Sequence, residues 1–102
     1  MATYIEVPVI DAASQQLSTS LGEYRFDLSL DFNAFSGRWA LGIAVDGEVL
    51  ERGRRVVLGA NLFQSIGRQY GELRAVDWSG SGAQPGRTEL PAGLVRLIHR
   101  AA

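Results

Sequence analysis

The sequence lacks cysteine and lysine, and it contains one histidine, one methionine and three prolines. Without cysteine it has no disulfide bond and no thiolate metal ligand, and it gives no sign of the redox compartment. A lone histidine without cysteine does not supply the ligands of a zinc site. No segment approaches the roughly 18 apolar residues that cross a bilayer. We therefore expect no metal, no cofactor and no membrane span.

Charge of neither sign predominates, because ten arginines and 11 acidic residues leave a net charge of −1. This balance does not favour general binding to nucleic acid or to anionic lipid. The exclusive use of arginine has two interpretations that the sequence does not separate. It reflects either a GC-rich genome or surface positions where the planar guanidinium pairs with carboxylates or with a partner.

A length of 102 residues fits a single domain, residues 1–102. A chain of this size buries roughly two-thirds of its unfolded surface, which allows one thin hydrophobic core. An apolar fraction of 46% and a charged fraction of 21% are ordinary for a globular protein. Residues 1–10 lack a basic start and a long apolar run, so we expect no signal peptide and synthesis in the cytosol.

The clearest structural signal is an alternation of apolar and polar residues between positions 24 and 32. The apolar set is Tyr24, Phe26, Leu28, Leu30 and Phe32. A period of two predicts a strand with one buried and one solvated face. Residues 33–37 should form a hairpin loop. The return strand, residues 38–45, buries every second side chain, beginning with Trp39.

The rest of the chain reads as short strands separated by turns. Further strands are expected at residues 3–10, 14–20, 72–78 and 94–99, and one more should run through Val49 and Leu50. Pro8 makes the first strand an edge strand or ends it, and Asp46-Gly47 is a strong hairpin turn. The register after that turn is uncertain by one residue.

Only residues 59–71 show helical spacing, with Asn61 as a cap for one or two turns. Residues 79–86 are a flexible loop by composition. The pattern as a whole predicts a mostly-β fold, a small antiparallel barrel or compact sandwich of about seven short strands with at most one short helix.

No constellation of residues predicts catalysis. His99 stands near the chain end without a serine in a nucleophile context, so we expect a structural or surface role. Asp27 and Asp31 lie about 13 Å apart on one strand face, too far to share a proton or a metal ion. The glycines of residues 79–86 lack the lysine and the following helix of a phosphate loop. We therefore expect no enzymatic activity.

Arg52, Arg54 and Arg55 form the one basic cluster. Three interpretations stay open: a solvated turn, pairing with a protein partner, or nucleic-acid contact. Nucleic-acid binding would require more basic residues and exposed aromatic rings for stacking.

Two further features complete the candidate interface. The stripe of Ala40, Gly42 and Ala44 would let another backbone approach closely, either from this chain or from another subunit. Trp78, before the Gly/Ser loop, fits either an interface hot spot or the rim of the core.

The order of motifs resembles a family of short phage tail proteins, long carried as a domain of unknown function and described as the plug, or ripcord, of contractile-tail baseplates. The resemblance covers about residues 4–99 and rests on order and spacing. The matching segments are Ile5-Glu6-Val7-Pro8, Gln15 with Leu17, Tyr24-Arg25-Phe26-Asp27-Leu28, Phe32-Asn33, Gly37-Arg38-Trp39, Asp46-Gly47, residues 54–59, Asn61-Leu62 and Gly71-Glu72-Leu73 with Asp77. Leu97-Ile98-His99 departs from the aromatic residue that is common in the last strand.

The resemblance implies a structural virion protein at the axis of a phage tail baseplate, made in the host cytoplasm. It implies contacts with hub, spike and tail-tube proteins, several copies with threefold or sixfold symmetry, and no catalytic residues. The alternative is a stand-alone β-barrel module that binds peptide, glycan or nucleic acid near Trp78.

Overall fold

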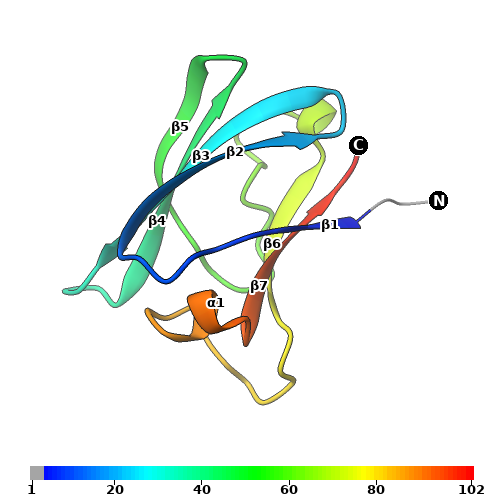
Figure 1. Ribbon diagram of the computed structural model, residues 1–102. Coiled ribbons are helices and arrows are strands. Elements are labelled where there is room, and N and C mark those ends of the chain that lie inside the picture. Colours follow the sequence, from blue (N-terminus) through cyan, green and yellow to red (C-terminus); the bar gives the residue numbers. More distant parts are fainter. Residues whose placement is uncertain (1–3) are drawn as a thin grey trace.

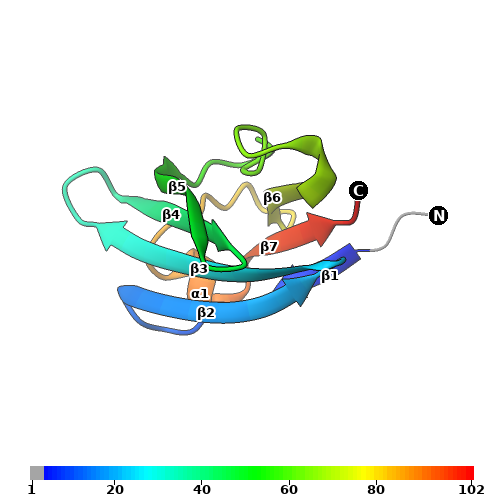
Figure 2. The ribbon, with the colours of Figure 1, turned by 90° about the horizontal axis from the view of Figure 1, so that it is seen from above.

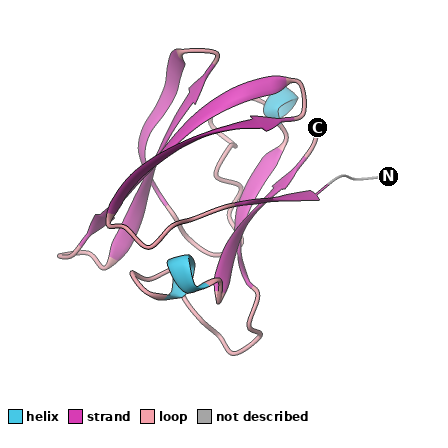
Figure 3. Cartoon of the chain, in the orientation of Figure 1, coloured by secondary structure: helices cyan, strands magenta, loops and turns pink. Residues whose placement is uncertain are grey.

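The computed structural model describes residues 4–102 and shows seven strands, one short α-helix and one turn of 3-10 helix. The strands form two antiparallel sheets that face each other across the core (Figure 1). The sheets are not joined into a closed ring, so the mostly-β fold and the sandwich are confirmed and the barrel alternative is wrong. Strand accounts for most of the regular structure (Figure 3).

The four-stranded sheet follows chain order and grows from two tight hairpins. Its strands are β2 (Ser14–Leu21), β3 (Tyr24–Asn33), β4 (Arg38–Val45) and β5 (Glu48–Arg55). The predicted alternation is confirmed, because apolar residues of β3 and β4 pair on the inner face, as Leu28 does with Ile43. Asp46 and Gly47 both take positive φ, as the predicted two-residue turn requires.

The three-stranded sheet brings the two ends of the chain together. Its order is β1 (Tyr4–Val7), β7 (Val95–Arg100) and β6 (Glu72–Asp77), so β1 is an edge strand. It ends one residue before Pro8, as expected from the missing N–H of proline.

The core lies between the sheets and draws on both of them. Its largest fully buried apolar side chains come from all parts of the chain: Trp39, Phe26, Phe63, Leu21, Leu28, Leu30, Leu41, Ile43, Leu62, Leu73 and Leu97. Phe26 and Phe63 stack with ring centroids 5.0 Å apart. The Trp39 indole N–H donates to the Gly86 carbonyl at 2.9 Å, so this tryptophan is core, as expected, and also anchors a loop.

His99 is a buried member of this core, which confirms a structural role. Its Nε2 lies 2.8 Å from the Tyr70 carbonyl oxygen and therefore carries the donating hydrogen. Its Nδ1 is buried without a hydrogen-bond partner among residues 4–102, and its ring packs against Phe26 and Phe63.

The helix prediction was only partly right. Within residues 59–71 the chain forms turns and one turn of 3-10 helix, η1 (Arg68–Tyr70). Asn61 does not cap a helix, because its Oδ1 accepts from the N–H groups of Phe63 and Leu73 and ties the segment to β6. The α-helix, α1 (Glu89–Ala92), was not expected; it is four residues long and ends at Gly93 in a left-handed conformation.

The free edges of the four-stranded sheet differ. β2 pairs with β3 alone, and Figure 2 shows it at the outer margin of this sheet. Hydrogen bonds alternate away from the Gly22-Glu23 turn, so the backbone groups of Ser14, Gln16, Ser18 and Ser20 point outward. Residues 14–21 contain no charge, no proline and no register shift. β5 is charged and its pairing is interrupted by two register shifts, which are common protections of an edge.

Candidate interaction surfaces

A groove of about 780 Å³ crosses the outer face of the four-stranded sheet. Its floor is made by small residues of β3 and β4, namely Ser29, Gly42 and Ala44. A Cβ at position 42 would collide with the Ser29 hydroxyl, so glycine is what lets that hydroxyl lie over β4. No element of residues 4–102 covers the stripe of small residues, and Ala40 belongs to the same face beyond the groove lining.

Uncharged and acidic side chains line the β2 side of the groove. Ser18 donates its hydroxyl hydrogen to Asp27, and Ser14 donates to Asp31 at 2.6 Å. Both aspartates are exposed, as expected of a solvated face. Within the described residues no three histidine, aspartate or glutamate side chains gather closely enough to share a metal ion.

The arginine cluster lies on β5, not in a turn, and the strand divides it. Arg52 lines the groove. Arg55 is opposite Ala40 on the outer face, whereas Arg54 is opposite the inward-facing Leu41. Among the ion pairs formed within residues 4–102, none involves these three arginines. The structure thus brings Arg52 together with Gly42 and Ala44, places Arg55 beside Ala40, and leaves Arg54 apart.

Trp78 directly follows β6 of the other sheet, in the turn after the strand, and is 56% exposed. The Arg96 guanidinium lies 4.7 Å from the centroid of its ring, a cation–π contact. Arg96 also donates to Glu6 at 3.1 Å and to the Gly93 carbonyl. The indole is therefore neither a core residue nor a bare aromatic face, and it lies outside the groove.

The outer face of the three-stranded sheet satisfies its own charges. Glu72 pairs with Arg74 at 3.1 Å and lies 3.8 Å from Arg100. Arg96 pairs with Glu6 across β7 and β1. Four of the ten arginines are internally paired within residues 4–102, and three of these four point from this sheet.

The loop that composition marked as flexible is held by one carboxylate. Asp77 accepts from the Ser79 hydroxyl and from the N–H groups of Gly80, Gly82 and Ala83. These donors, the Ser79 hydroxyl foremost, lower the pKa of Asp77 below its ordinary value. The pKa of Glu89 is also lowered, mainly by its own backbone N–H.

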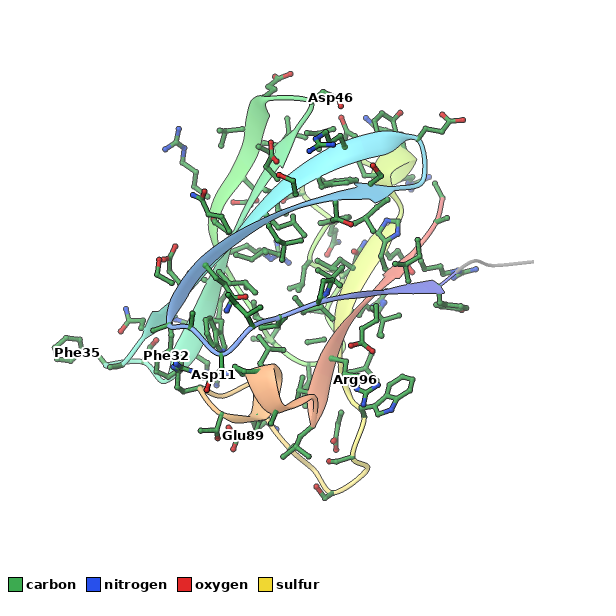
Figure 4. The ribbon with its side chains drawn as sticks, in the orientation of Figure 1. Asp11, Phe32, Phe35, Asp46, Glu89 and Arg96 are labelled. Carbon is green, nitrogen blue, oxygen red and sulfur yellow. The ribbon has the colours of Figure 1, made fainter. Side chains whose placement is uncertain are left out.

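Sequence reasoning missed the most exposed aromatic ring of the molecule. Phe35 lies at the tip of the β3–β4 hairpin, is fully exposed, and projects beyond the ribbon (Figure 4). The signal was present in the sequence, since a phenylalanine inside a predicted polar turn has no core to enter.

Neither helix of the described chain is long or apolar enough to span a bilayer. No curated protein matches the sequence. The profile of a family described as "Cyanophage baseplate Pam3 plug gp18" matches residues 3–101. A match over nearly the whole length, on a mostly-β sandwich, confirms the expected resemblance, and the chain belongs to this family of structural baseplate plug proteins.

Proposed function

We propose that the protein is a central subunit of a phage tail baseplate that links the hub or spike to the end of the tail tube and helps to close the tube. Family membership supports a structural, non-enzymatic component of the virion that contacts other baseplate proteins. The axial position, synthesis in the host cytoplasm and the identity of the neighbours are part of the proposal.

The observation that carries the proposal is the open outer face of the four-stranded sheet. A groove with a floor of small residues runs beside a strand whose arginines have no carboxylate partner within residues 4–102. Arginine is enriched at interfaces because its planar fork pairs with carboxylates in two parallel hydrogen bonds. We propose Arg52, Arg55, Ala40, Gly42 and Ala44 as the contact surface for a neighbouring baseplate protein. We propose Arg54, on the opposite side of β5, and Trp78, after β6, as separate contacts.

Threefold or sixfold copy number is a further part of the proposal. Copies arranged around a tail axis contact one another through two different surfaces. Such head-to-tail contacts form a ring when the rotation from each copy to the next adds up to a full turn. The unlike edges of the four-stranded sheet, uncharged β2 and charged β5, fit such a head-to-tail arrangement better than a self-complementary one.

The test is association with purified hub, spike and tail-tube proteins of the same phage, measured by size exclusion with light scattering. Arg55→Glu should weaken the complex, whereas Arg68→Glu should leave it unchanged, because both substitutions shift the charge equally but Arg68 lies on η1. A wild-type chain that stays monomeric and ignores all three proteins would overturn the proposed function. Equal weakening by both variants would reject the β5 surface.

A further inference from the structure

The tip of the β3–β4 hairpin presents a single aromatic ring that the fold does not use. Phe35 is fully exposed, so it contributes no buried surface to this chain. Residues 33–37 contain no charged side chain. Burial of this tip against another protein would therefore remove apolar surface from water without the cost of desolvating a charge.

The backbone of the tip is already satisfied internally. Asn33 Oδ1 accepts from the N–H groups of Phe35 and Ser36 at 2.9 and 3.2 Å. The Asn33 carbonyl accepts from the Gly37 N–H at 2.8 Å. Three consecutive N–H groups thus keep their partners when water is excluded, and the turn is ordered before it meets a partner.

Charged side chains line clefts on the surface of this chain. Three clefts formed by residues 4–102 each carry at least three charged side chains. Asp27, Asp31 and Glu51 line the groove with Arg52, and Glu72 with Arg100 lines both of the others. A phenyl ring in any of them would cover charges without pairing them. The charges of these clefts therefore favour a different protein over a second copy as the occupant.

We propose that Phe35 is an anchor residue that inserts into an apolar pocket of a different baseplate protein. This inference rests on the proposed function and adds to it a named contact and the chemistry of the partner site. The partner pocket should be uncharged at its base, deep enough for one phenyl ring, and tolerant of the polar Asn33 and Ser36 at its rim.

The experiment compares Kd values of the wild-type chain and three variants for purified hub, spike and tail-tube proteins. Phe35→Ser should raise the Kd at least about tenfold, because a central aromatic anchor dominates an interface. Asn33→Ala keeps the ring but removes the turn acceptor, and it should raise the Kd roughly two- to tenfold through the added ordering cost. Tyr4→Ser removes a ring that is 63% exposed on β1, in the other sheet, and should have no effect.

The thermal midpoint of Phe35→Ser should equal that of the wild type, which separates lost contact from lost folding. A wild-type complex that Phe35→Ser does not weaken would overturn the anchor and leave the baseplate role intact. Self-association that Phe35→Ser abolishes would show that a second copy is the occupant and would also overturn it. A wild-type chain that binds none of the three proteins would overturn both the anchor and the proposed function.

Discussion

The two sheets differ in whether the arginines on their outer faces are paired with carboxylates. On the three-stranded sheet, Arg74, Arg96 and Arg100 each find a carboxylate of the same sheet. On the four-stranded sheet, Arg52 and Arg55 find none within residues 4–102. Arginines that are already paired gain little from a partner, whereas planar cations that lack such a pair within the described chain and lie beside a groove are available to pair with a partner's carboxylates, which is the basis of the proposed contact surface.

The largest expected effect comes from the core that both sheets share. Trp39→Ala should lower the free energy of unfolding by about 3–5 kcal/mol, because it leaves a large cavity and removes the hydrogen bond to Gly86. Urea denaturation measures the loss, and Trp39→Phe should retain most of the stability. If Trp39→Ala costs under about 1 kcal/mol, the sheets do not depend on a common core.

A smaller loss should follow from the segment that crosses between the sheets. Asn61→Ala removes the acceptor for the N–H groups of Phe63 and Leu73 and should cost about 1–3 kcal/mol. Asn61→Asp keeps an acceptor oxygen and should remain close to the wild type in the same denaturation experiment. Equal destabilisation by both variants would show that the acceptor is not what matters.

The sequence predicts those parts of the fold and of the candidate surfaces that depend on neighbouring residues, and it does not predict those that depend on contacts between distant residues. The alternation in residues 24–45 predicts β3, β4 and their buried faces, because a period of two is a local property. The role of Asn61 was misread, since its second donor, Leu73, is twelve residues away. The division of Arg54 from Arg55 follows from the extension of β5 through Arg55, because neighbouring residues of a strand face opposite sides. The strand that the sequence predicts around Val49 and Leu50 stops short of these arginines.

Substitutions on the outer faces of the two sheets should lower the stability only slightly, and by different amounts. Glu72→Gln breaks pairs with Arg74 and Arg100, but these side chains are about half exposed, so the loss should stay under about 1 kcal/mol. Arg55→Gln breaks no ion pair within residues 4–102 and should change the thermal midpoint less. A larger loss for Arg55→Gln than for Glu72→Gln would reverse the comparison between the sheets.

The smallest effect should be confined to the loop after β6. The folded-state pKa of Asp77 is lowered, so its contribution to loop order is present above the ordinary carboxyl pKa and is lost as the pH falls through the lowered value. The amide resonances of Gly80, Gly82 and Ala83 should titrate together by NMR, with a midpoint below the ordinary aspartate range. In Asp77→Asn the same resonances should show no such transition.

The unpaired edge of β2 finally has a consequence for when the protein is produced relative to its partners. Two uncharged, regular edges of this kind can pair with each other, and such encounters become more frequent as the chain accumulates. A subunit that is not yet assembled with other baseplate proteins can therefore self-associate through β2. We expect the chain to remain soluble to higher concentration when it is produced together with its baseplate partner, so that supply is matched to assembly.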